Sequence, residues 1–544
     1  MIGESAMRWA LRIGAGTAAL GLLLAAGAPV FTNDVFWHVT TGDHLLTHGL
    51  WPGADPFSFT AGGQSWVLHE WLTQVLFAAV HAIGGLPGLR LLTVVLTAGV
   101  LLLAVRSAQR RVVTTPLVCL ALVLFAALVH ARIQTRPTLL TLIAFLVLVP
   151  RLLDTATPWR RRDAVLLIAL QLLWTNAHSV ALAALPLMAV FVVGRILDAR
   201  LARAGATSFR APEPGELRRL SLTLFGMAAA TLCTPAGTTL WSFAWQDKGD
   251  VMQYVADEWA PFSFVPGAAE ALPLATYLGV WCTTALLALG YLGTALALHR
   301  APHRLRSPAL PAPSRVLTML ALFGAALLAR RFHWLCFFVA LASLESLRVA
   351  VREIGWSAFA RGARVTVARA LLALGCLCCG VMVGARSAEV EGRSPFVAAC
   401  GAHYWTDDLA GFLHLDALDF LVEAGMQGNV VCHYNSGGLI SWRGYPRLRV
   451  LIDSRIDLYR RDIYLDYVAV RDGRPDQQAI LDRYGANIYF RHWDLAPPVD
   501  KRAWIPTFKG KDGEVWLRRD ATTTAANLEL ARAWSARHAA QPPR

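Results

Sequence analysis

Apolar runs of about 20 residues recur through residues 1–385 of this 544-residue chain. A run of that length is what an α-helix needs to cross a hydrocarbon core about 30 Å thick. Charged residues make up only 16% of the chain, so few polar groups interrupt the runs. A soluble protein would carry roughly 25%. The sequence therefore predicts a polytopic α-helical membrane protein.

The distribution of basic residues predicts how the chain threads the membrane. The net charge is +14, and the arginines cluster in short loops between apolar runs, which is typical of cytoplasmic loops. The alternation predicts about 11 transmembrane helices, from Met1–Val30 to Val365–Val383, with a cytoplasmic N-terminus. A cleaved signal peptide is the alternative interpretation of Met1–Val30. Because topology accounts for the basic residues, we expect no nucleic acid as a partner.

The C-terminal segment differs in composition and predicts a second domain. We expect a transmembrane domain over 1–385, with a first outer loop at 31–87, and a soluble extracytoplasmic α/β domain over 386–544. Cys400 and Cys432 form a disulfide there or remain free thiols. Helix-like stretches (Asp407–Glu423, Arg461–Val470, Gln477–Tyr484) alternate with strand-like ones (Asn429–Tyr434, Leu448–Asp453, Asn487–Arg491, Glu514–Arg518).

The first outer loop concentrates acids, imidazoles and tryptophans in an otherwise apolar chain. Polar groups beside a membrane are costly unless they are solvated or used, so they indicate a functional site. Asp34 is the first candidate for a catalytic base because it lies nearest the end of the first predicted helix. The supporting catalytic candidates are Asp55, Glu70, His38 and His69.

Simpler interpretations of this loop stay open. Asp55 caps the turn DPFSFT, or Glu70 only pairs with His69 or an arginine. The apolar piece Val67–Ile83 carries several polar residues, and we interpret it as interfacial or re-entrant. Leu89–Val105 then crosses the membrane.

A second polar set lies at the outer ends of the predicted spans. Arginine at an outer boundary runs against the usual charge bias, so a local reason is needed. An anionic ligand such as a phosphate or pyrophosphate held by arginine forks supplies one. The predicted donor-phosphate contacts are Arg132 and Arg136 (HARIQTRP), His178 (WTNAHS), and Arg330 and Arg331 (ARRFHW).

Metal binding has a limited basis in the sequence. Mg²⁺ or Mn²⁺ held by Asp34 and a second carboxylate is the metal site that the acids permit. His44 and His48 are four residues apart, which suits two ligands on one helix face, but no HExxH motif accompanies them. We expect no organic cofactor.

Several motifs together resemble a family of largely uncharacterised bacterial membrane proteins. They are NDVFWHVTTGDHLL, PGADPFSFT, WVLHEWL, TRPTLL, WTNAHS, DEWAPF, NSGGLISW and VLIDSRIDLY. That family in turn resembles the GT-C superfamily of polyprenyl-phosphate-dependent glycosyltransferases. The resemblance implies a GT-C-like fold in the bacterial inner membrane, with the C-terminal domain extracytoplasmic. It also implies that the first-loop acid, here Asp34, is the catalytic base or a metal ligand.

The chain departs from the GT-C pattern in two respects. The paired acids common in some branches are absent, since Asn33 precedes Asp34 and Val35 follows it. No WWDxG-type acceptor motif appears, which argues against an oligosaccharyltransferase proper.

The function favoured by these features is a glycosyltransferase. It would move a sugar from a polyprenyl-phosphate donor to a glycan, lipid or protein acceptor on the outer face. A transporter or flippase of a lipid-linked substrate is one alternative, although few charges lie within the apolar runs.

A non-catalytic envelope assembly protein is the other alternative, with the C-terminal domain as its binding module. Asn435, Gly437 and Gly438 follow one predicted strand, and Asp453 and Arg455 follow another, as ligand-binding residues do in α/β domains. The simpler interpretation is that the two glycines form a turn and that Asp453 pairs with Arg455.

Overall fold

The computed structural model describes residues 4–27, 33–49, 53–112, 115–205, 209–245, 261–262, 274–300, 312–353, 415–492, 495–511 and 513–539. The chain divides into two compact units. Unit 1 comprises Met1–Ala28, Arg90–Thr238 and Ala256–Gly401, and unit 2 comprises Pro29–Leu89, Thr239–Val255 and Ala402–Arg544. The first outer loop therefore shares a compact unit with the C-terminal segment. The predicted domain boundary at 385/386 lies outside the described residues.

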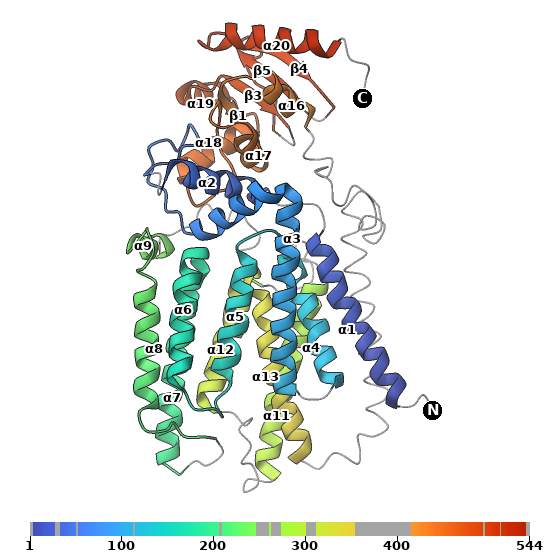
Figure 1. Cartoon of the computed structure of the whole chain (residues 1–544), viewed down its shortest axis with the longest axis vertical. Helices are drawn as coiled ribbons and strands as arrows, with labels where there is room; N and C mark the ends of the chain where they lie inside the picture. The colour runs from blue at the N-terminus through green and yellow to red at the C-terminus, as the bar shows by residue number, and fades with distance from the viewer. Residues whose placement is uncertain are drawn as a thin grey trace. The chain divides into compact units, whose positions relative to one another are not determined.

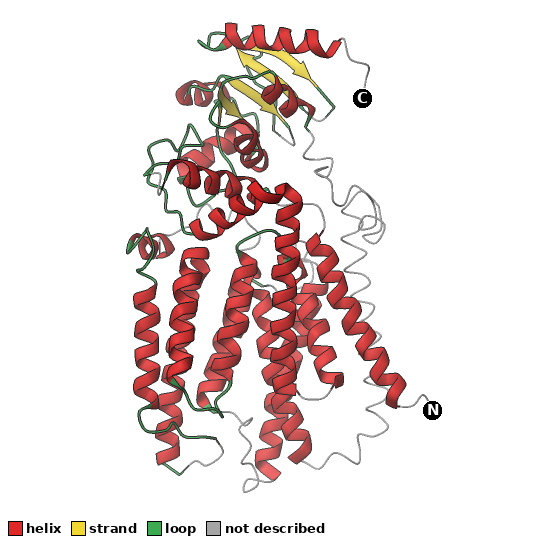
Figure 2. Ribbon diagram, viewed as in Figure 1, coloured by secondary structure: helices red, strands yellow, loops and turns green. Residues whose placement is uncertain are grey.

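Unit 1 is a bundle of helices that run side by side (Figures 1 and 2). Three short 3₁₀ helices interrupt its described part, η1 (His130–Arg132), η2 (Ser179–Ala183) and η4 (Arg330–Leu335). The α-helices are α1 (Glu4–Gly27), the second part of α3 (Trp71–Val112), α4 (Thr115–Val129), α5 (Thr138–Leu153), α6 (Arg161–Ala177), α7 (Ala184–Arg203), α8 (Glu216–Ala230), α11 (Leu274–Arg300), α12 (Pro313–Leu328) and α13 (Cys336–Glu353).

The apolar character of this bundle confirms a helical membrane protein. Among the described residues, four stretches are long and apolar enough to cross a membrane: Trp71–Val112, Ser179–Arg203, Thr276–Ala295 and Arg330–Ala350. Shorter apolar helices lie at Arg12–Leu24, Leu117–Arg132, Thr138–Leu153 and Pro313–Leu328. Every predicted span up to Leu347 overlaps a described helix, and Val365–Val383 lies outside the described residues. The predicted number of spans is not established by these helices.

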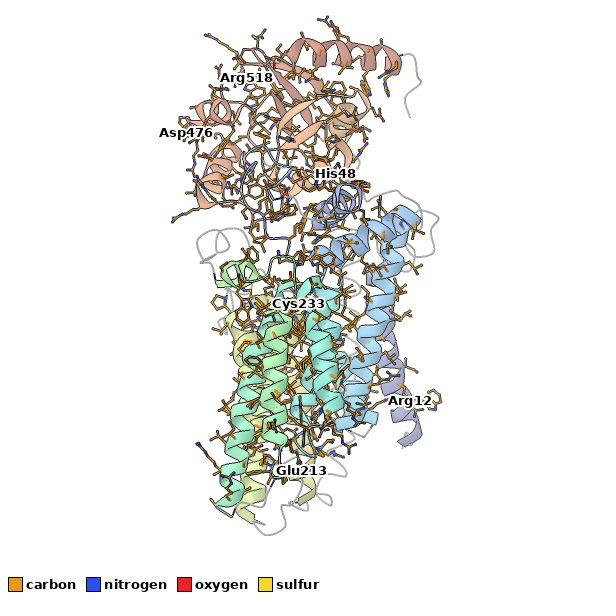
Figure 3. All side chains as sticks on the ribbon, turned by 60° about the vertical axis from the view of Figure 1, so that its left-hand side comes forward. Arg12, His48, Glu213, Cys233, Asp476 and Arg518 are labelled. Carbon is orange, nitrogen blue, oxygen red and sulfur yellow. The ribbon has the colours of Figure 1, made fainter. Side chains whose placement is uncertain are left out.

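Buried ion pairs join the helices at one end of the bundle. Arg195 on α7 donates to Asp198 at 2.7 Å and to Glu216 on α8 at 3.0 Å. Asp198 also accepts hydrogen bonds from the backbone and hydroxyl of Ser314 on α12, at 3.1 and 2.6 Å. Figure 3 labels Glu213, near this network, and Cys233 at opposite ends of the bundle. These fully satisfied charges fix the packing of α7, α8 and α12.

Unit 2 contains a five-stranded sheet with strand order β2–β1–β3–β5–β4. Strands β2, β1 and β3 are parallel, and β5 and β4 add to β3 as an antiparallel pair. The strands are β1 (Gly428–Val431), β2 (Leu448–Val450), β3 (Ile488–Arg491), β4 (Trp504–Lys509) and β5 (Glu514–Arg518). The helices are α2 (Asp34–His48), the first part of α3, α9 (Thr239–Trp245), α16 (Asp416–Glu423), α17 (Tyr434–Gly444), α18 (Arg461–Arg471), α19 (Gln477–Tyr484) and α20 (Thr524–Ala539).

This α/β arrangement confirms the predicted class of the C-terminal segment and corrects one prediction. The four predicted strands correspond to β1, β2, β3 and β5. Gly437 and Gly438 do not form a turn but lie inside helix α17. A Cβ atom on Gly437 would lie 2.1 Å from the carbonyl oxygen of Ile452, and one on Gly438 would lie 3.0 Å from that of Asn33. The glycines therefore allow α17 to approach both the segment after β2 and the start of α2.

The first outer loop extends the sheet of unit 2. Ser58 pairs with Val450 in a parallel bridge beside β2. The backbone of Phe59 donates to the carbonyl oxygen of Val450, and the backbone of Val450 donates to that of Phe57, both at 3.1 Å. A loop segment nearly 400 residues away in sequence thus covers the exposed edge of β2.

Helix α3 has a break where the sequence predicts that an interfacial segment ends and a membrane-spanning segment begins. Gly85 has φ 59° and ψ −154°, which are not helical angles and which a residue with a side chain rarely adopts. The break lies between Val67–Ile83, predicted to be interfacial, and Leu89–Val105, predicted to span the membrane. Residues 71–84 belong to unit 2, and the helix from Arg90 onward belongs to unit 1.

Candidate functional site

A buried ion cluster joins the first outer loop to the C-terminal segment. Arg455 donates to Asp55 at 2.7 Å and, through Nη2 and Nε, to Asp453 at 2.6 and 2.9 Å. All three side chains are at most 1% exposed. The guanidinium carbon of Arg455 also lies 4.6 Å from the centre of the Trp66 ring. The predicted pair of Asp453 and Arg455 is confirmed, and Asp55 is an additional partner.

The contacts of Asp55 are those of a structural carboxylate. Its oxygens accept from the backbone of Phe57 at 3.2 Å and of Ser58 at 2.9 Å, as in a capped turn. Burial by itself would raise the pKa of Asp55, but the charge and hydrogen bonds of Arg455 outweigh burial and hold the pKa below its usual value. Asp55 is therefore a positioning residue in this structure, and its predicted catalytic role stays a prediction.

Four ionisable side chains form a chain of contacts beside this cluster. Glu70 is buried, and its Oε2 lies 3.8 Å from Nδ1 of His38. Its other oxygen lies 3.9 Å from Nε2 of His69. The opposite ring nitrogen of His69 lies 3.8 Å from Oδ2 of Asp457. The structure thus brings together three of the predicted residues, and Asp457 adds a carboxylate from the C-terminal segment.

Local packing holds this chain of side chains in place. His38 is 2% exposed; its ring lies tilted by 35° against Trp37, with ring centres 3.7 Å apart, and meets the edge of Phe77 at 5.9 Å. The ring of His69 lies 4.8 Å from that of Phe243 on α9. Helix α2 also packs tightly on α3, because a Cβ atom on Gly42 would lie 2.0 Å from the carbonyl oxygen of Gln74. The imidazoles therefore have little freedom to turn away from Glu70.

Asp34 is the first residue of α2 and is partly exposed. It lies four residues before His38, so the two side chains share one face of the helix. A helix start also favours a carboxylate, because its free backbone amides and dipole carry partial positive charge. The sequence prediction placed Asp34 beside the other acids of the loop, and the structure puts it on the same helix as His38.

Asp457 is the residue of this set that the sequence prediction missed. It lies in VLIDSRIDLY, two residues after Arg455, in the segment that follows β2. The signal was a second acid placed after a strand end, where α/β domains hold functional groups. Nothing in the local sequence links that acid to a histidine almost 400 residues earlier.

The described residues do not fit a complete metal site. Among them, no three His, Cys, Asp or Glu side chains gather closely enough to hold a metal ion. His44 and His48 stack with their ring centres 4.4 Å apart. The pKa of His44 lies below its usual value, mainly because the ring is partly buried and to a smaller extent because His48 is close. The predicted Mg²⁺ or Mn²⁺ at Asp34 stays a prediction.

The cysteine prediction has a partial answer. Cys432 is a buried free cysteine, so the structure does not contain the disulfide with Cys400. Cys400 itself lies outside the described residues. Burial raises the pKa of the Cys432 thiol to about 12, which keeps it protonated and unreactive.

The predicted phosphate contacts belong to unit 1 and lie at helix ends. Arg132 lies in η1, Arg136 lies in the following turn, and Arg330 and Arg331 lie in η4. His178 ends α6, and its Nδ1 lies 2.6 Å from the hydroxyl of Thr141. These residues are half-buried or buried, so their charges are poorly hydrated.

His333 interacts with two of these arginines, although it was not among the predicted phosphate contacts. Its ring is 2% exposed, and neither ring nitrogen has a hydrogen-bond partner. The positive charges of Arg132 and Arg330 both act on the ring, and Phe262 covers it edge-on at 5.1 Å. A buried imidazole that feels the charge of two arginines and has no hydrogen-bond partner of its own suits an anionic ligand.

The predicted site residues thus fall into two sets, one in each compact unit. Unit 2 holds the acids and imidazoles of the first outer loop, together with Asp457. Unit 1 holds the arginines, His178 and His333. The class of protein that these observations define is a helical membrane protein whose first outer loop is built into an α/β unit.

Comparisons with known proteins give a likeness of structure alone. No family model matches the chain, and no curated protein matches it. The crystal structure of the Archaeoglobus fulgidus oligosaccharyltransferase in its apo form is 12% identical, has a TM-score of 0.48, and matches over 90% of this chain and 70% of that one. The same enzyme in complex with Zn and sulfate gives 12% identity and a TM-score of 0.48, over 89% and 68%. Similarity at this level assigns neither an activity nor site residues to this chain.

Proposed function

We propose that the chain is a membrane glycosyltransferase. It transfers a sugar from a polyprenyl-phosphate donor to a hydroxyl or amide of a glycan, lipid or protein acceptor, on the outer face of the bacterial inner membrane. The observation that supports this most is the chain of contacts among His38, Glu70, His69 and Asp457, with His38 and Glu70 buried and Asp34 on the same helix as His38. Ionisable groups held close together with little access to water are typical of acid–base sites.

The proposed reaction is a displacement at the anomeric carbon of the donor sugar. The acceptor oxygen or nitrogen forms a bond to that carbon, and the bond from the carbon to the phosphate oxygen breaks. The acceptor proton passes to Asp34, which is partly exposed at the start of α2. Glu70 and the two imidazoles orient the acceptor and hold the surrounding charge.

The departing polyprenyl phosphate carries negative charge that must be stabilised. In this proposal the arginine set of unit 1 binds it, with Arg132 and Arg330 as charge partners and His333 as a hydrogen-bond donor. Arginine forks match phosphate oxygens in geometry and stay charged at every relevant pH. Removing one such contact from the transition state typically costs 10²–10³ in turnover.

The test is sugar transfer in membranes supplied with labelled polyprenyl-phosphate sugars. Asp34→Asn should abolish transfer, and Glu70→Gln should lower it by about 10² or more. Asp43→Asn is the matched control, because Asp43 is an exposed acid on the same helix. Full activity of Asp34→Asn would refute the assignment of the base. Absence of transfer from every donor, in an intact and inserted protein, would favour transport or assembly instead.

The phosphate contacts need their own readout. His333→Phe keeps a buried ring of similar size but removes both ring nitrogens. We expect a higher KM for the lipid donor, a lower kcat, and an unchanged KM for the acceptor. Equal kinetic constants for His333→Phe and the wild type would remove His333 from the proposed phosphate site.

A further inference from the structure

The first part of α3, residues 71–84, is a helix of unit 2 whose apolar side is exposed. Leu76 and Ile83 are 36% and 90% exposed, and Leu72 and Ala79 are partly exposed. At about 100° per residue, these positions fall within about 60° of one another around the helix axis. They form one continuous surface, which we call the apolar stripe and which consists of Leu72, Leu76, Ala79 and Ile83.

The opposite side of the same helix is buried and includes polar residues. Thr73 and Gln74 are 0% and 2% exposed, and Phe77 beside them is 1% exposed. This side packs on α2, because a Cβ atom on Gly42 would lie 2.0 Å from the carbonyl oxygen of Gln74. A surface helix of a soluble protein has the reverse pattern, with its polar residues on the outer side. The apolar stripe is therefore poorly suited to contact with water.

No charged residue interrupts this helix. Residues 71–84 contain no Asp, Glu, Lys or Arg, and His81 is their one ionisable side chain. The ring of His81 meets Trp442 of α17 edge-on, with ring centres 5.6 Å apart. Trp442 and Trp71, at the start of the helix, are both partly exposed, and tryptophan is enriched where a membrane meets water. An exposed apolar surface with these neighbours is typical of a membrane contact.

The length of the helix and its place in the chain favour a position along the membrane surface. Residues 71–84 rise by about 21 Å, which is too short to cross a hydrocarbon core of about 30 Å. The non-helical angles of Gly85 end the helix, and the predicted span Leu89–Val105 begins only five residues after Gly84. Five residues reach at most about 18 Å. The chain itself therefore keeps the apolar stripe close to the membrane.

We propose that the apolar stripe is a membrane-docking surface of unit 2, with Leu72, Leu76 and Ile83 in contact with phospholipid acyl chains. Helices that lie in this way sit about 5–10 Å into the boundary between headgroups and acyl chains. Glu70 directly precedes the helix, so this contact holds the ionisable side chains of the first outer loop at the level of the lipid headgroups. The surface does not depend on the proposed transfer reaction, because lipid contact alone defines it.

Site-specific photocrosslinking in vesicles tests this contact. The full-length chain with Ile83→photoleucine or Leu76→photoleucine is reconstituted in phosphatidylethanolamine and phosphatidylglycerol and then irradiated. Photoleucine carries a diazirine on an apolar side chain of similar size, so it perturbs an exposed position little. Leu465→photoleucine is the matched control, because Leu465 on α18 of unit 2 is also apolar and is 46% exposed, but lies outside the apolar stripe. Mass spectrometry identifies the adduct and the part of the lipid that carries it.

We expect phospholipid adducts at positions 76 and 83, attached to acyl chains, and none above the unirradiated background at position 465. Equal lipid adducts at positions 83 and 465 would overturn the proposal, because they would show no preference for the apolar stripe. Adducts at position 83 to headgroups alone, or to a second copy of the protein, would overturn acyl chains as the partner. Sugar transfer is not part of the readout, so failure of the proposed function would leave this result unchanged.

Discussion

The ion cluster of Arg455 allows a sharp test of how the first outer loop is held. The perturbation is Arg455→Met, which keeps most of the side-chain volume and removes the charge. Arg455 is 1% exposed and bonds to both Asp55 and Asp453. Its removal leaves two carboxylates buried without their partner.

The magnitude follows from the cost of an uncompensated buried charge. Breaking one buried ion pair by deleting a partner typically costs 3–5 kcal/mol. Here the removal of one side chain leaves two carboxylates without their charged partner, although Asp55 keeps its two backbone hydrogen bonds. We therefore expect the free energy of unfolding of unit 2 to fall by about 3–5 kcal/mol at pH 7.

The pH dependence gives the prediction a distinctive sign. In the wild type the pKa of Asp55 lies below its usual value of 3.8, because Arg455 outweighs burial. Its contribution to stability is therefore complete above pH 3.8 and is lost as the pH falls through the lower, folded-state pKa. Without Arg455, burial remains and raises the pKa of Asp55. As the pH falls, Asp55 therefore becomes protonated in the variant before it does in the wild type, and protonation removes its unpaired buried charge. The difference in stability between wild type and variant should shrink as the pH falls from 7 toward about 4.

Pulse proteolysis in increasing urea measures this difference on the full-length chain. A C-terminal tag reports the fraction of unit 2 that survives, and the midpoint gives the free energy of unfolding. Arg460→Met is the matched control, because Arg460 forms an exposed pair with Asp462, with side chains 67% and 55% exposed. Exposed pairs contribute little to stability. A loss for Arg455→Met no larger than that of the control, or one that grows at acid pH, would refute the reasoning.

Three further predictions use the same unit. Gly437→Ala should destabilise unit 2 by about 1–3 kcal/mol, because the new Cβ would lie 2.1 Å from the carbonyl oxygen of Ile452. Gly53→Ala is the control, since its Cβ would have no neighbour within 4 Å, and equal urea midpoints for the two variants would contradict the prediction. Burial lowers the pKa of His492 to about 4, so stability should fall as the pH drops from about 6.5 toward 4, and His492→Gln should flatten that fall. Asp457→Asn should lower kcat for sugar transfer and shift its acid limb while leaving the donor KM unchanged; an unshifted pH profile would reduce Asp457 to a structural role.

Much of the fold could be predicted because its signals are local. Apolar runs and their basic loops predicted the positions of the helices of unit 1, and short β-rich stretches predicted four strands of unit 2. The prediction failed where local signals conflict with tertiary packing. Strand β4 was missed because Pro506 argues against a strand, yet β4 is an edge strand, where proline is tolerated. Helix α17 was missed because Gly437 and Gly438 favour a turn, whereas close packing requires them.

The candidate site was predictable only as far as its residues are neighbours in sequence. The density of acids and histidines after the first span identified Asp34, His38 and Glu70. The residues that complete the arrangement come from elsewhere: the bond from Arg455 to Asp55 joins positions 400 residues apart. His333 was missed for a related reason, because its lack of hydrogen-bond partners exists only once η4 is folded. Sequence reasoning identifies the chemistry of a site but not the partners that position it.

These long-range contacts indicate why the C-terminal segment is part of this chain. A polar loop beside a membrane cannot bury Asp55, Phe57 and Trp66 by itself, since burial of a charge requires a partner and burial of rings requires a core. Residues 428–458 supply both, through the edge of β2, the guanidinium of Arg455 and the apolar cluster around Ile452. The segment therefore folds as one compact unit with the first outer loop. It determines the conformation of the loop, and through Asp457 it reaches the histidine that contacts Glu70.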